Sequence, residues 1–222
     1  MPERIVQQNM YTIPDDLEFS SAALLEPLAC AVHGADRTEI HLGDTVAIIG
    51  AGPIGLMFLQ LVKLRGARAI VCDLSPFRLG VARQLGADVV LNSGEVSDIV
   101  QAVRDVTGGG LGADVVVEAI GLPETWEQAV DMVRAGGFVN LFGGCRSGTR
   151  FSIDTARIHY DEVRVTGVYH HTPRHVRIAR DLLARHQVNA DALISGKVPL
   201  ERLVDALTMP DDAKIKVAVI PW

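Results

Sequence analysis

Residues 45–55 read TVAIIGAGPIG, a β-branched apolar run that leads into a glycine-rich turn. The run predicts a buried strand over 45–50, and the apolar spacing after the turn predicts a helix over 53–65. A second apolar run, ARAIVCD at 67–73, predicts the next strand and ends on Asp73, eighteen residues after the last glycine of the turn. Strand, glycine turn, helix start and terminal carboxylate together are typical of a dinucleotide-binding βαβ unit.

Each glycine of this turn has a physical task in such a unit. Gly50 permits the tight turn, Gly52 lets the backbone approach a pyrophosphate, and Gly55 lets the helix pack closely on the strand. Asp73 would accept hydrogen bonds from both hydroxyls of an adenosine ribose and would repel a 2′-phosphate, so the sequence favours NAD over NADP. The nearby Arg78 would attract a phosphate and weakens that preference slightly. The plainer alternative is a structural glycine turn beside a surface aspartate.

Strands and helices continue to alternate after this unit. Further strands are predicted at 88–92, 113–121, 136–143 and 163–169, with helices from Pro76 to near Gly86, over 95–106, over 123–134 and from Pro173 onward. Strands rich in Val and Ile that are separated by helices indicate a parallel sheet covered on both faces. The sequence therefore predicts an α/β fold with a doubly wound parallel sheet, the Rossmann fold.

The composition excludes several classes of partner. The formal net charge of −6 argues against nucleic acid, which needs a basic face. No apolar run approaches the roughly 20 residues of a membrane span, and the N-terminus lacks the apolar core of a signal peptide. Three widely spaced cysteines, at 30, 72 and 145, fit a reducing compartment. We expect a cytoplasmic protein with neither nucleic acid nor a membrane as a partner.

Several motifs occur in a characteristic order and spacing. They are IPDDLEFSSAALLEPLACAVHG (13–34), GAGPIG (50–55), DLSPFRL (73–79), LGAD (85–88), GADVVVEAIG (112–121) and GGFVNLFGG (136–144). Together they resemble the zinc-dependent medium-chain dehydrogenases, in particular the polyol branch with sorbitol and threonine dehydrogenases. The resemblance covers essentially the whole chain. It implies an NAD(H)-dependent oxidoreductase that transfers hydride between a secondary alcohol or polyol, a small-molecule substrate, and nicotinamide.

The resemblance also assigns residues to the phosphate and adenosine end of the cofactor. The backbone at Gly52, Pro53 and Ile54 would hold the pyrophosphate, at the exposed N–H groups of the helix start. Arg78 would act with the strand-end aspartate at the adenosine end. Lys216, in KIKV, would reach the pyrophosphate from a C-terminal strand.

A second group of residues is assigned to the nicotinamide end by the same resemblance. Ala119 and Ile120 would border the cofactor ribose, and Phe142 and Gly143 would present a backbone edge to the nicotinamide carboxamide. Cys30 would lie beside the nicotinamide, at a place that Thr often occupies in the family. A reactive thiol is the less favoured interpretation of this cysteine.

Glu26, in LEPLAC, stands where the family places a catalytic-zinc ligand or a residue that holds the zinc-bound water. The other family ligands, a Cys and a His-Glu or His-Asp pair, belong to a GroES-like domain upstream. The resemblance thus implies zinc with an incomplete site, because catalytic zinc needs about three protein ligands. We expect residues 1–14 to be a remnant of that domain and to form a strand, 15–192 to be the NAD-binding domain, and 193–222 to return to the catalytic domain.

Histidines cluster in YHHTPRH, with His170, His171 and His175. The last two are four residues apart, a spacing that would bring two imidazoles together on a helix. Thr172 as the helix cap and Pro173 in the first turn place His171 outside that helix, so we interpret the cluster as a polar helix start, with a metal site as the less favoured alternative. An upstream histidine, at position 33, is interpreted as a packing residue.

Two alternatives to this enzyme stay open. One is a non-catalytic module that binds NAD, and the other is a zinc-independent reductase of the same superfamily. The motif around Glu26 speaks against the reductase, because the zinc-free branch generally lacks it. The resemblance also implies a homo-oligomer, a dimer or tetramer, paired through the sheet edge at 138–144 and 163–169.

Overall fold

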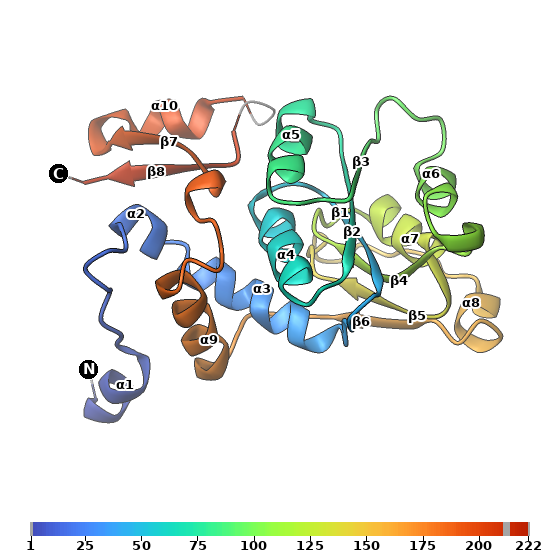
Figure 1. The fold of residues 1–222 in the computed structure, drawn as a ribbon, viewed down its shortest axis with the longest axis horizontal. Coiled ribbons are helices and arrows are strands. Elements are labelled where there is room, and N and C mark those ends of the chain that lie inside the picture. Colours follow the sequence, from blue (N-terminus) through green and yellow to red (C-terminus); the bar gives the residue numbers. More distant parts are fainter. Residues whose placement is uncertain (1, 211–213, 222) are drawn as a thin grey trace.

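A computed structural model describes residues 2–210 and 214–221. Six strands form one parallel sheet (Figure 1), in the order β3-β2-β1-β4-β5-β6. The strands are β1 (Thr45–Ile49), β2 (Arg68–Asp73), β3 (Val89–Asn92), β4 (Ala113–Glu118), β5 (Val133–Leu141) and β6 (Arg164–Gly167). Strand order reverses between β1 and β4, which defines the doubly wound topology. The predicted Rossmann fold is confirmed.

Helices cover both faces of the sheet. One layer consists of α3 (Leu25–Arg37), α4 (Pro53–Leu64), α5 (Pro76–Gln84) and α9 (Pro173–Ala184), and the other of α6 (Ile99–Asp105) and α7 (Pro123–Met132) with the short α8 (Thr155–His159) beside it. Alternate strand residues point to opposite layers. Val46 and Ile48 pack in the first core, whereas Ala47 and Ile49 pack in the second. Burial on both faces explains the unbroken apolar runs.

The turn between β1 and α4 is set by two glycines. Gly50 has a φ of 100°, in the left-handed region that favours glycine. A Cβ added to Gly55 would lie 1.8 Å from the Gly50 carbonyl oxygen, so only glycine lets α4 start this close to the strand. Both observations agree with the tasks that the sequence pattern predicts for these positions.

Several predicted boundaries shift because side chains cap the elements. The helix predicted over 95–106 starts at Ile99, since the Asp98 carboxylate accepts a hydrogen bond from Gln101 N and caps α6. The strand predicted over 113–121 ends at Glu118. Its side chain bonds the next N–H groups of the backbone, which therefore leave the ladder.

The N-terminal segment differs from its prediction. Residues 1–14 were expected to form a strand, but Glu3–Asn9 is helix α1, and Gln7 Nε2 donates to Glu3 Oε1 at 2.9 Å, one turn away. Glu, Arg and Gln are good helix formers, and no strand among the described residues pairs with this segment. A second short helix, α2 (Phe19–Ala22), follows. Membership of a GroES-like domain stays a prediction.

The C-terminal segment lies outside the main sheet, and its return to a catalytic domain stays a prediction. β7 (Ile194–Pro199) and β8 (Lys216–Ile220) form a parallel pair of their own. Helix α10 (Leu203–Thr208) and the 3-10 turns η2 (Asp191–Leu193) and η3 (Leu200–Arg202) complete this part, which Figure 1 shows as a separate small layer beside α2.

Replacing Gly55 with alanine should destabilise the fold by about 3 kcal/mol or more, because the methyl group would force α4 away from the turn. The control is Gly80→Ala in the middle of α5, where nothing lies within 4 Å of an added Cβ. That change should stabilise by up to about 1 kcal/mol. Urea unfolding measures both variants, and equal unfolding free energies would refute the close-packing argument.

Candidate functional site

A cavity of about 500 Å³ opens at the carboxyl ends of β1, β2 and β4, where the strand order reverses. This is where open α/β sheets place their ligands. Its lining residues are Gly50, Gly52, Asp73, Leu74, Ser75, Pro76, Arg78, Ala119 and Ile120. A second cavity of about 490 Å³ shares Asp73, Leu74 and Ile120 with it and extends towards α6. We call the first of these the switch-point cavity.

The start of α4 forms one wall of the switch-point cavity. Gly52 is the N-cap of this twelve-residue helix, and Pro53 occupies its first turn. Nothing lies within 4 Å of a Cβ built on Gly52, so the backbone is open to a close ligand. The unpaired N–H groups and the helix dipole favour an anion at this position.

The Asp73 carboxylate ties two turns of the switch-point cavity together. Its Oδ2 accepts a hydrogen bond from Ala51 N at 2.6 Å, and its Oδ1 accepts one from Ser75 N at 2.8 Å. The Ser75 hydroxyl in turn accepts from Arg78 N at 3.3 Å and caps α5. The Arg78 side chain donates through Nε to the Lys214 carbonyl at 3.2 Å. The carboxylate is therefore held in place before any ligand arrives.

Glu118, at the end of β4, organises the backbone on the other side of the cavity. It is fully buried, and its Oε1 accepts three hydrogen bonds of 2.8 Å, from Ile120 N, Gly121 N and the Thr125 hydroxyl. The other oxygen, Oε2, is buried and has no hydrogen-bond partner among the described residues. Sequence reasoning missed this residue. The motif VVVEAIG places it at a strand end, which was its one visible signal.

The predicted nicotinamide edge is fixed by the same strand end. Phe142 N and Gly143 N both donate to the Glu118 carbonyl, at 3.0 and 2.8 Å, and the Gly143 carbonyl accepts from Trp126 Nε1 at 3.0 Å. The Phe142 ring packs edge-on against Phe58, with 5.0 Å between ring centroids. These contacts hold the segment after β5 beside the segment after β4.

Helix α3 carries the predicted metal residue and the predicted nicotinamide neighbour on one face. The Cys30 thiol donates to Glu26 Oε1, with Sγ and Oε1 3.3 Å apart. Burial and the adjacent Glu26 raise the pKa of Cys30 to about 12, so this thiol is not an activated nucleophile. His170, in the β6–α9 loop, joins them, and one ligand atom from each of Glu26, Cys30 and His170 lies within 4.8 Å of the others.

The remaining histidines have structural contacts. His175 Nδ1 accepts from Thr172 N at 3.1 Å and completes the cap of α9, and its ring stacks on His33 with centroids 4.5 Å apart. His33 Nδ1 lies 2.8 Å from the His170 carbonyl, which makes that nitrogen the donor. His171 precedes α9, which begins at Pro173 as predicted. His33 is a packing residue, which agrees with its prediction.

Most of the residues predicted to bind the phosphate and ribose parts of the cofactor lie at or next to the switch-point cavity, but one does not. Gly50, Gly52, Asp73, Arg78, Ala119 and Ile120 line the switch-point cavity, with Pro53, Ile54 and Gly55 in the helix that opens from it. Lys216 lies elsewhere, in a cavity of about 270 Å³ between α2 and the β7–β8 pair. Its contact with a pyrophosphate stays a prediction.

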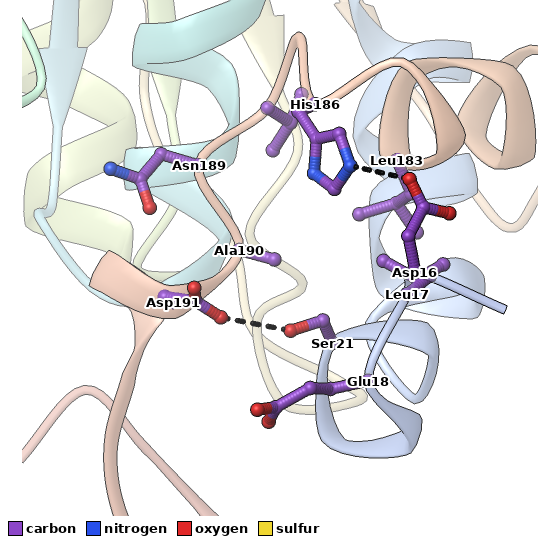
Figure 2. Close-up of a pocket in the computed structure, with 10 residues that line it drawn as sticks. Asp16, Leu17, Glu18, Ser21, Leu183, His186, Asn189, Ala190 and Asp191 are labelled. Atoms are coloured by element: carbon purple, nitrogen blue, oxygen red, sulfur yellow. Dashed lines mark hydrogen bonds and ion pairs between the residues drawn. The ribbon is translucent and has the colours of Figure 1, made fainter. Parts of the chain in front are cut away.

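Another cavity, of about 260 Å³, lies between the segment before α3 and the segment after α9 (Figure 2). His186 Nε2 lies 3.3 Å from Asp16 Oδ2, and the Ser21 hydroxyl donates to Asp191 at 3.0 Å. Asp16, Glu18 and Asp191 in its walls would repel an anionic dinucleotide. We interpret these contacts as structural links between the two segments.

The strand order and the glycine turn define an α/β protein of the Rossmann class. Residues 53–185 match the family described as zinc-binding dehydrogenase, and the chain belongs to this family.

Curated dehydrogenases are similar in sequence to nearly the whole chain. Sorbitol dehydrogenase of Bacillus subtilis (strain 168) is 32% identical over 97% of the chain and 61% of its own length. D-arabitol-phosphate dehydrogenase of Enterococcus avium is 32% identical over 96% of the chain and 61% of its length. The chain thus spans about three fifths of these relatives.

Solved structures show the same fold. A zinc-binding dehydrogenase from Sinorhizobium meliloti 1021, bound to NADP, superposes with a TM-score of 0.89 at 34% identity and covers 95% of this chain and 62% of that one. For 2R,3R-butanediol dehydrogenase from Bacillus subtilis the TM-score is 0.85 at 28% identity, with 96% and 60% covered. Within residues 2–210 and 214–221, no helix has the length and apolar character needed to cross a membrane.

Glu118→Val should destabilise the protein by about 2–4 kcal/mol, because three partly buried donors lose their acceptor. Glu118→Gln keeps an acceptor oxygen at this position and should cost about 1 kcal/mol or less. Thermal and urea unfolding measure the difference. Equal losses in the two variants would show that the three hydrogen bonds are not what makes Glu118 important.

The His175 side chain should make stability depend on pH. Burial lowers the pKa of His175 below the usual imidazole value of 6.5, with further lowering by His33, Arg174 and His171 and an opposing contribution from Asp36. Native His175 therefore binds protons less readily than the unfolded chain. Its contribution to stability is complete above pH 6.5 and is lost as the pH falls below it.

Urea unfolding between about pH 7.5 and 5 tests this dependence. The slope of stability against pH should be shallower for His175→Gln than for the unsubstituted chain. His41→Gln, which changes an exposed histidine, should keep the original slope. A slope that is unchanged in His175→Gln would contradict the assignment.

Proposed function

We propose that the chain binds NAD(H) in the switch-point cavity and forms the cofactor-binding part of an oxidoreductase that acts on a secondary alcohol or polyol. The observation that carries the proposal is the combination of the open N-terminus of α4 at Gly52 with the anchored carboxylate of Asp73. The family and the dehydrogenase relatives support it. The bound nicotinamide would supply the acceptor or donor of hydride.

The chain's own residues would bind and orient this cofactor. The pyrophosphate would lie at Gly52, Pro53 and Ile54, where the N–H groups of Gly52 and Ile54 would meet its charge; Pro53 has no N–H and would contribute the start of the helix. The ribose hydroxyls would donate to the Asp73 carboxylate, whose oxygens retain lone pairs beyond those used by backbone N–H groups. Ala119 and Ile120 would border the cavity on the β4 side. Glu118 would keep that wall in place through its three hydrogen bonds.

The preference between NAD and NADP depends on two opposite charges. Asp73 would repel a 2′-phosphate, and Arg78 would attract one. We propose NAD, because Asp73 lines the cavity at the end of β2 with its carboxylate fixed by Ala51 N and Ser75 N. Arg78 lines the same cavity and donates through Nε to the Lys214 carbonyl. Because a similar dehydrogenase structure contains NADP, the affinities for NADH and NADPH are measured side by side.

Asp73→Asn should weaken NADH binding by about tenfold or more, because a hydrogen bond to a charged group contributes about 1.5–3 kcal/mol. The affinity for NADPH should fall less than the affinity for NADH, since the substitution removes the charge that repels the 2′-phosphate. NADH fluorescence titration measures both affinities. Asp154→Asn, which changes a carboxylate that caps α8, is the control and should bind like the original chain. NADPH binding tighter than NADH before substitution would overturn the preference.

Turnover separates the proposed oxidoreductase from its two alternatives. The purified chain is mixed with NAD and a panel of secondary alcohols and polyols, with and without added zinc. Reduction of NAD supports the proposal, and dependence on zinc distinguishes it from a zinc-independent reductase. NADH binding without any turnover would leave a dinucleotide-binding module.

We also propose a homo-oligomer that pairs through β6. This strand, Arg164–Gly167, is at the edge of the sheet and has one neighbour, β5. An unpaired edge offers N–H and C=O groups to a second strand. Sedimentation equilibrium of the purified chain tests the proposal, and a monomer at all concentrations would exclude it.

A further inference from the structure

One face of α3 gathers side chains of the kinds that bind metals. Glu26, Cys30 and His33 are spaced four and then three residues apart, so they lie above one another on the helix. Glu26 is exposed and Cys30 is half-buried, which leaves the face accessible from solvent. His33 uses its Nδ1 to hold the His170 carbonyl at 2.8 Å. The face therefore has two groups that point outward and one that anchors a loop.

The anchored loop brings a third ligand-type side chain to this face. His170 has a φ of 57°, which is uncommon for a residue with a side chain. Such a conformation persists only where surrounding contacts hold it, and it often marks a functional position. With this backbone, ligand atoms of Glu26, Cys30 and His170 all lie within 4.8 Å of one another.

We propose that Glu26, Cys30 and His170 form a binding site for one transition-metal ion of the zinc type, complete within this chain. The donor set of one carboxylate oxygen, one thiolate and one imidazole is borderline in softness and suits zinc rather than magnesium or calcium. Three protein ligands with one open position are also the usual set of a catalytic zinc.

The spacing of the ligand atoms fits tetrahedral coordination after small side-chain movements. Ligands that bind zinc at about 2.0–2.3 Å lie about 3.3–3.8 Å apart. Cys30 Sγ and Glu26 Oε1 are already 3.3 Å apart. The thiol proton that now joins them would pass to solvent when the metal binds, with no change of oxidation state.

Neighbouring side chains would support the ligands. His171 Nε2 lies 3.5 Å from Glu26 Oε1, so it would orient the carboxylate. His33 would keep the His170 backbone in place. Partners of this kind commonly fix the geometry of metal ligands.

This site differs from the one that the family resemblance implies. The resemblance supplies Glu26 alone and draws the other ligands from another domain, whereas Cys30 and His170 come from the residues described here. The inference does not rest on the proposed function, because metal binding at α3 needs neither NAD nor turnover. NADH affinity of the unsubstituted, metal-free chain is measured in parallel and reports the proposed function separately.

The test is a Co²⁺ titration of the full 222-residue chain under anaerobic conditions. We expect one ion per chain, visible bands of tetrahedral cobalt and an intense near-ultraviolet band of thiolate-to-cobalt charge transfer. Zinc should displace the cobalt and abolish these bands. Cys30→Ser should remove the charge-transfer band, and Glu26→Gln and His170→Gln should weaken binding by more than about tenfold, since even indirect partners of a metal contribute about 10–100-fold.

Matched controls change the same residue types elsewhere. Cys145→Ser removes another partly exposed thiol, and His186→Gln removes an exposed histidine that contacts Asp16. Both should bind cobalt like the original chain. Urea midpoints of all variants show whether each is folded, and both Glu26 and His170 are exposed. No binding, a cobalt spectrum without the thiolate band, or equal losses in the controls would overturn the proposal.

Discussion

The close contact between the start of α4 and the turn after β1 is the constraint on which the site depends. Because Gly55 has no side chain, the helix begins directly against the Gly50 carbonyl. Its unpaired N–H groups consequently open on the point where the strand order reverses. The Asp73 carboxylate then connects this turn to the start of α5 through Ala51 N and Ser75 N. The shape of the cavity, the exposed N–H groups at its edge and the position of the carboxylate all depend on this close contact between helix and strand.

Local spacing explains how much of this arrangement the sequence could predict. Strands buried on both faces leave continuous apolar runs, and the glycine turn and Asp73 follow a fixed pattern within one βαβ unit. The Rossmann fold and the positions of Gly50, Gly52 and Asp73 at the cavity could therefore be predicted from the sequence, whereas the lining residues Leu74, Ser75 and Pro76 were not named as site residues. Element boundaries were less so, because a capping side chain such as Asp98 decides where a helix starts.

Features made by distant segments escaped prediction. Glu118 looks like an ordinary strand end in the sequence; its side chain bonds the turn that follows, and its carbonyl accepts from the distant segment after β5. The meeting of His170 with Glu26 and Cys30 depends on the loop that leads into α9 packing on α3. The N-terminal helix α1 replaced a predicted strand because that expectation came from resemblance, whereas its Glu and Gln residues favour a helix.

The anchored carboxylate has a consequence for the kinetics of ligand association. Since backbone N–H groups already fix both Asp73 oxygens, the two turns around them do not need to become ordered when a nucleotide arrives. Little conformational entropy is then lost at the adenosine end, and preorganisation of this kind increases affinity by lowering that loss. A nucleotide would then bind at Asp73 to a site that is already formed. Diffusional encounter, rather than rearrangement of the loops, would set the association rate.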